Sequence, residues 1–144
     1  MNGTIEQRRY TRYTTDIPVL YGLRHADGEG KYSMRNVSQG GLCFRAARHI
    51  EPGTSIHVFI PICRPSFEVD GEVVWCQEQE GEYDLGIRFD EPTHEFGAWM
   101  VDQVRKIEQY KIDTERDQSR SVSGEQAAAE WIAMHPDLTP SAHV

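Results

Sequence analysis

Long apolar runs are missing from the sequence. No stretch comes near the ~18 consecutive apolar residues that a helix needs to cross a bilayer. Residues 1–7 also lack the charged and then apolar pattern of a secretory signal. We therefore expect a cytoplasmic protein with no membrane insertion.

Cysteine is scarce as well. Cys43, Cys63 and Cys76 are odd in number and far apart, and they form no C-x-x-C pair. This spacing indicates neither a disulfide framework nor a zinc site, so we expect free, buried thiols. The histidines are scattered without metal-ligand spacing and predict no bound metal: His25, His49, His57, His94, His135 and His143.

Basic residues are outnumbered, with 15 Lys and Arg against 23 Asp and Glu, for a net charge of −8. Binding along DNA or RNA needs a broad basic surface, so this balance argues against nucleic acid as a partner. The charges are unevenly placed, because residues 8–12 carry three arginines and no acid, whereas residues 68–95 carry ten acids and only Arg88 as a base. One small basic spot on an acidic protein favours a small, compact anion over a polymer.

At 144 residues the chain suits one domain with an appended segment. We predict a flexible N-terminal arm over residues 1–16, a barrel plus helix over residues 17–112, and a linker with a short helix over residues 113–144. The arm is polar and has no apolar repeat of helical period.

Short runs with alternating apolar residues, separated by turns, predict six strands. Ile56, Val58 and Ile60 show the alternation most clearly. Six such strands indicate a sandwich or a small closed barrel, and we favour the barrel because closure removes exposed edges. The predicted fold class is therefore all-β dominated, a six-stranded antiparallel β-barrel. Its expected strands are 17–24, 31–37, 41–46, 54–61, 67–77 and 83–89.

Two features of the later strands bear on the site. Trp75 continues the alternation of Phe67 and Val73, so we predict that it packs in the barrel, with stacking on a purine as the alternative. Gly71 can mark a bulge in the same strand. Arg88 alternates outward and is expected to be solvated.

Helices are expected after the last strand. Thr93 can cap a helix that presents one apolar stripe to a face or mouth of the barrel, consisting of Phe96, Met100, Val104, Ile107 and Lys111. Residues 114–121 have no large apolar side chain and predict a linker. Ser123 and Gln126 then form a capping-box pattern before a short helix whose apolar tip can dock on the barrel, pack in a homodimer, or bind a partner protein.

Two separated motifs carry a resemblance to a known family. Arg8 and Arg12 match R-x-x-x-R, and Asn36, Ser38 and Gly41 match [D/N]-x-S-x-x-G. Together with the runs 71–75 and 85–89, they make residues 6–112 resemble the PilZ domains of bacteria. The resemblance implies a six-stranded antiparallel barrel that binds cyclic di-GMP, often as an intercalated pair, with the arginine arm folding over the ligand.

The residue types suit this ligand. A planar guanidinium can bond a phosphate or the O6/N7 edge of guanine bidentately, and cyclic di-GMP offers two of each. Glycines permit positive φ and a close approach of the backbone to the ligand. The predicted ligand-binding residues are Arg8, Arg9, Arg12, Asn36, Ser38, Gly40, Gly41 and Trp75. No catalytic residue, metal or cofactor is expected.

The sequence bears on three possible functions. The favoured one is a cyclic di-GMP receptor or adaptor whose arm closes over the ligand and changes a docking surface for an unidentified effector protein. The alternative is a family member that acts as an interaction protein without nucleotide, which the intact motifs disfavour. An enzyme finds no support, because the sequence has no carboxylate pair or Ser/His/Asp set. Gln7, just before the arginine motif, leaves the number of bound ligands open.

Overall fold

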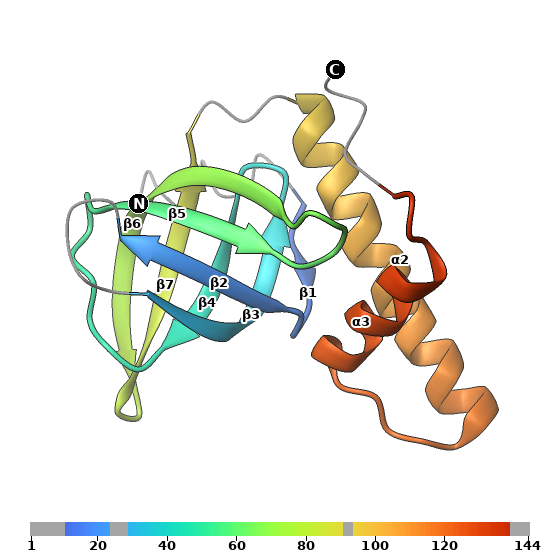
Figure 1. The fold of residues 1–144 in the computed structure, drawn as a ribbon. Coiled ribbons are helices and arrows are strands. Elements are labelled where there is room, and N and C mark those ends of the chain that lie inside the picture. Colours follow the sequence, from blue (N-terminus) through green and yellow to red (C-terminus); the bar gives the residue numbers. More distant parts are fainter. Residues whose placement is uncertain (1–10, 24–28, 91–93, 139–144) are drawn as a thin grey trace.

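The computed structural model describes residues 11–23, 29–90 and 94–138 (Figure 1). Six of its strands close into a barrel, because the sheet order β3-β2-β5-β6-β7-β4 returns to β3 through a β3–β4 pairing. All of these pairings are antiparallel, which confirms the predicted barrel. The strands are β1 (Tyr13–Thr14), β2 (Pro18–Leu23), β3 (Glu29–Ser38), β4 (Gly41–Ala46), β5 (Ser55–Ile60), β6 (Phe67–Gln79) and β7 (Glu82–Phe89).

Alternating side chains explain why these segments form strands. In β5 the three apolar residues Ile56, Val58 and Ile60 are fully buried, while the residues between them are half-buried. The period of two places one set of side chains inside the barrel and the other set outside. The short strand β1 extends the sheet at the edge of β3 and is not part of the closed ring.

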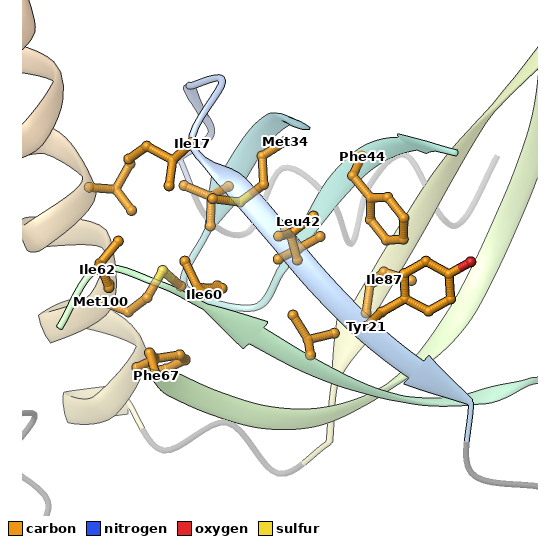
Figure 2. Close-up of a cluster of buried hydrophobic side chains, with 14 of the residues drawn as sticks. Ile17, Tyr21, Met34, Leu42, Phe44, Ile60, Ile62, Phe67, Ile87 and Met100 are labelled. Atoms are coloured by element: carbon orange, nitrogen blue, oxygen red, sulfur yellow. The ribbon is translucent and has the colours of Figure 1, made fainter. Parts of the chain in front are cut away.

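The barrel interior is a continuous apolar core. Figure 2 shows Met100, from the first helix after the barrel, pointing toward Ile60, Ile62 and Phe67. The other end of the core contains Tyr21 and Phe44, whose ring centroids are 5.4 Å apart. The helix therefore closes one end of the barrel, in agreement with the predicted covering of a face or mouth (Figure 1).

This helix, α2 (His94–Gln118), is longer than predicted. Met100, Val104 and Ile107 are fully buried, as the apolar stripe predicts. The expected linker over residues 114–121 is wrong in its first half, because α2 continues to Gln118 and ends where Ser119 adopts a φ of 52°. Thr114 is buried inside the helix, so a polar stretch here belongs to a packed element. Thr93, the predicted cap, lies outside the described residues.

The second helix, α3 (Gly124–Met134), begins as predicted, with the Ser123 hydroxyl accepting a hydrogen bond from the backbone N–H of Gln126. It packs mainly against α2, where the Trp131 and Tyr110 rings lie 6.1 Å apart. Met134 at its tip is about half exposed. Neither described helix has the length and apolar character needed to cross a bilayer.

Glu130 ties α3 to the end of α2, and this contact depends on pH. The carboxylate accepts hydrogen bonds from Arg120, at 2.9 Å and 3.3 Å, and from the Tyr110 hydroxyl and the Gln126 side chain. Arg120 first, and then Tyr110, lower the pKa of Glu130 from 4.5 to about 2. A carboxyl whose pKa is lower in the folded state stabilises the fold above its unfolded pKa and loses that effect as the pH falls.

We therefore expect the stability contributed by Glu130 to be lost as the pH falls from about 4.5 to about 2. Glu130→Gln should be less stable than the parent at pH 7 and should show a weaker loss of stability across that acid range. Urea unfolding at several pH values measures both effects. Glu78→Gln, at an exposed position of β6, is the control. Parallel stability curves for the parent and Glu130→Gln would contradict the assignment.

Candidate ligand-binding site

Five residues from five strands form one row across the outside of the barrel. The cross-strand partners run from Thr14 to Asn36, Cys43, Gly86 and Trp75. Directly opposed residues of antiparallel strands project from the same face. The neighbouring row of Val37, Leu42, Ile87 and Val73 is buried, so this row, which we call the outer row, faces outward.

Trp75 belongs to the outer row because β6 contains a bulge. Its pairing with β7 shifts register between Val73 and Trp75, which moves the indole from the core face to the outer face. The predicted packing of Trp75 inside the barrel is therefore wrong. Gly86 makes room for the ring, since a Cβ there would overlap the indole atoms. The indole lies over Gly86 and is half-buried.

Cys43 forms the floor of the outer row. It is 6% exposed, and burial first, then the Asp84 carboxylate, raise the pKa of its thiol to about 11. Arg35, Arg12 and Arg45 lower the pKa of the same thiol, so positive charges also act on the floor. The thiol is protonated at neutral pH, so the floor is small, uncharged and bordered by positive charge.

The turn between β3 and β4 carries the second motif. Ser38 bonds within the turn, since its hydroxyl accepts from the Gly40 N–H at 3.3 Å and donates to the Gly41 carbonyl at 3.4 Å. Gly41 is needed for close packing, because a Cβ there would collide with the carbonyl oxygen of Ile87. The expected positive φ is not found at either glycine, as the described glycines with positive φ are Gly53 and Gly81.

Helix α2 supports this turn from behind. A Cβ on Gly97 would lie 2.7 Å from the Gln39 carbonyl oxygen, so the turn rests directly on the helix backbone. Asn36 is half-buried in the outer row, between Thr14 and Cys43. The Asn36–Gly41 segment is thus a fixed wall of the site, held by β4, β7 and α2.

The residues that follow the arginine motif are bound to the helices. We call Tyr13–Asp16, the last four residues of the predicted arm, the arm root, and they contact β3 and the helices. Thr15 is 3% exposed. Each of three root residues contacts a helix: Tyr13 lies under the Arg105 guanidinium at 5.1 Å from its ring centroid, Thr15 donates to Glu108 at 2.6 Å, and Asp16 accepts from Lys111 at 3.2 Å and from the Gly124 N–H at 3.3 Å.

Of the arginine motif, only Arg12 falls in the described part of the chain, and Arg8 and Arg9 lie outside it. Arg12 is exposed, directly precedes β1, and acts electrostatically on Cys43. The structure therefore brings Arg12, Asn36 and Trp75 together around the outer row. Arg12, the described residue of the first motif, thus lies next to the strand pair that carries Asn36 of the second motif.

Three further residues of this face were not among the predicted site residues. Cys43 and Gly86 form the middle of the outer row, and Arg88 lies opposite Gly41 and pairs with Glu72 at 2.9 Å. Arg88 is exposed, as predicted. Gly41 and Cys43 are two residues apart, as are Gly86 and Arg88, so the sequence places the two members of each set on one face of their strand. The sequence does not show that these two strands are neighbours in the sheet.

Comparison with known proteins agrees with this architecture. The family model described as the PilZ domain matches residues 6–106. The chain belongs to the PilZ domain family. The match covers both motifs, the barrel and the first half of α2, and it ends before α3. No curated protein matched the sequence.

Solved structures show the same fold. The PilZ domain of YcgR from Escherichia coli, solved with c-di-GMP, has a TM-score of 0.62 at 14% identity, with 77% of this chain and 98% of that chain covered. The inhibitor of motility MotI/DgrA from Bacillus subtilis gives 0.56 at 15% identity, over 72% of this chain and 52% of that chain. This PilZ domain protein thus spans about half the length of the Bacillus protein.

The described residues of the site carry groups that can form hydrogen bonds and stack on a ring. They offer guanidinium donors, an amide, a hydroxyl held in a turn, and an aromatic ring. In the described part of the chain, no group of three or more His, Cys, Asp or Glu side chains is arranged to hold a metal ion. Cys43 and Cys63 are free and buried, as predicted, whereas Cys76 is half-buried.

Proposed function

We propose that this PilZ domain is a cyclic di-GMP receptor in which the ligand lies on the outer row and Arg8, Arg9 and Arg12 close over it. The observation that carries the proposal is the meeting of Arg12, Asn36 and Trp75, from three separate segments, around the uncharged floor at Cys43. Guanidinium groups bind phosphates and the O6/N7 edge of guanine bidentately. Cyclic di-GMP presents both kinds of acceptor.

In the proposed site, the wall contacts the edge of a base and Trp75 contacts its face. The Asn36 amide can donate and accept, which suits the edge of a base, and Ser38 holds the turn that shapes the wall. Gly40 and Gly41 leave the approach to the wall free of side chains. The indole of Trp75 offers a face on which a purine can stack, and base–aromatic stacking contributes about 1–3 kcal/mol per base.

The effector function follows from where the arm is attached. Ligand binding would fix the arginines at the outer row and change the surface next to the arm root. We propose that this change alters docking on an effector protein in the cytoplasm, and that the domain performs no chemistry on the ligand. The structure of the Escherichia coli YcgR domain with c-di-GMP supports the choice of ligand.

Calorimetric titration tests the proposal. We expect cyclic di-GMP to bind at micromolar concentration or below, and GTP, cyclic GMP and cyclic di-AMP to bind far more weakly, because none of them combines two guanine edges with two phosphodiester groups. The fitted stoichiometry also decides between one and two ligand molecules. Absence of binding by cyclic di-GMP would favour an interaction protein that acts without nucleotide. Chromatography of the ligand after incubation should return it unchanged.

A further inference from the structure

A second bulge places an arginine beside the outer row. The pairing of β3 with β4 shifts register between Met34 and Asn36, so Arg35 is the extra residue of β3. In such a bulge two residues of one strand oppose a single residue of the other, here Cys43. Met34 is buried and Arg35 is exposed, so the Arg35 side chain projects outward next to Asn36.

The backbone of Arg35 is also fixed to the arm root, since the Thr15 N–H donates to the Arg35 carbonyl at 3.3 Å. Its side chain and that of Arg12 both act on the Cys43 thiol. Arg35 precedes Asn36 in β3, and Arg12 directly precedes the strand β1 that pairs with Asn36, so both arginines are attached to the backbone on this side of the floor.

Arg35 has no acidic partner among the described residues, a property that it shares with Arg12 and Arg64. Four other arginines of the described chain pair with a carboxylate, namely Arg45 with Asp84, Arg88 with Glu72, Arg116 with Asp117 and Arg120 with Glu130, at 2.9 to 3.0 Å. On a protein with a net charge of −8, an exposed arginine without a carboxylate partner among the described residues is available to an external anion.

We propose that Arg35 is a further ligand-binding residue, outside both family motifs, that contacts a phosphodiester group of the bound cyclic dinucleotide. This inference rests on the proposed function. The positive charges of Arg12 and Arg35 repel each other beside the outer row. An anion bound between them is attracted to both, which offsets this repulsion. Arg35 stands on a barrel strand, so its charge is in place before the arm closes.

The phosphate, and not the guanine edge, is the group that Arg35 contacts, because the adjacent Asn36 amide already suits a base edge. The distinction can be measured. The ammonium group of lysine can also bind a phosphate, because this contact needs only a positive charge. Bidentate bonding to O6 and N7 of guanine requires the planar guanidinium of arginine.

The test compares Arg35→Ala, Arg35→Lys and Arg64→Ala in calorimetric titrations with cyclic di-GMP. Arg64 is the matched control, since it is exposed, lies between β5 and β6, and has no acidic partner in the described ranges. We expect Arg35→Ala to raise Kd about tenfold or more, the size of one charge-assisted contact. Arg35→Lys should stay within about threefold of the parent, and Arg64→Ala should match the parent.

Salt provides the second readout. The difference between Arg35→Ala and the parent should shrink as NaCl rises from about 50 mM to about 500 mM, because screening weakens a contact between charges. All three variants should keep the parent melting temperature.

The outcomes separate this inference from the proposed function. If the parent binds and Arg35→Ala binds equally well, the Arg35 inference fails and the receptor function stands. If Arg35→Lys is as weak as Arg35→Ala, the phosphate assignment fails. If the parent does not bind cyclic di-GMP at all, the proposed function fails, and the inference fails with it.

Discussion

Replacing Arg12 with alanine is expected to abolish calorimetric binding of cyclic di-GMP. Arg12 is the arginine of the first motif that directly precedes β1, which pairs with the wall at Asn36, and it acts on the floor at Cys43. A lost bidentate contact to a charged or guanine acceptor raises Kd by about 100-fold. Arg8→Ala should have a similar effect, because both guanidinium groups contact the ligand in the proposed site.

Neither arginine change should affect the fold. Arg12 is exposed and makes no hydrogen bond or ion pair with the other described residues, so the circular dichroism spectrum and the melting temperature should equal those of the parent. Arg116→Ala removes one positive charge from the far end of α2 and serves as the control for net charge. Parent-like binding by Arg12→Ala would overturn the site assignment.

Replacing Gly41 with alanine is expected to destabilise the barrel strongly. The new Cβ would collide with the carbonyl oxygen of Ile87, which is backbone and cannot rotate away. Relief requires β4 and β7 to separate where Gly41 pairs with Arg88 and where the Phe89 N–H donates to the Gly40 carbonyl at 2.9 Å. We expect unfolding free energy to fall by about 2–4 kcal/mol and the melting temperature to fall by about 8 °C or more.

Gly22→Ala is the matched control for this substitution. Gly22 also lies in a barrel strand, but a Cβ there meets no atom within 4 Å and its φ is not positive. Its melting temperature should stay close to that of the parent, since the change mainly restricts the unfolded chain. Equal stability of Gly41→Ala and Gly22→Ala in urea and thermal unfolding would show that β7 yields to the added methyl group.

Much of the barrel was predictable because period-two alternation is local to each strand. Residues 41–46 were predicted with the observed bounds of β4, and the buried faces of β5 and β7 follow directly from their sequences. The prediction of a barrel then required only that the six strands form a closed ring, and the β3–β4 pairing closes this ring.

The errors occurred where a residue's position depends on another part of the chain. The bulges at Trp75 and Arg35 arise from pairing with β7 and β4, and nothing within β6 or β3 alone fixes them. Residues 114–118 are polar, yet they continue α2 because the helix packs against α3. The contacts of the arm root were not predicted, because its partners, such as Glu108 and Gly124, are about 100 residues away.

The fixed arm root determines how the arginine motif meets its ligand. Because Tyr13 and Thr14 are paired with β3, the Cα of Arg8 can lie no farther than about 14 Å from that of Arg12, whatever path the four intervening peptide units take. Confinement within that radius gives the Arg8 guanidinium an effective concentration on the order of 0.1 M at the outer row. In the proposed site, a nucleotide held by Arg12 and the wall would then meet Arg8 in an intramolecular step. The short spacing between Arg8 and Arg12 in the sequence would therefore increase the avidity of the site for the nucleotide.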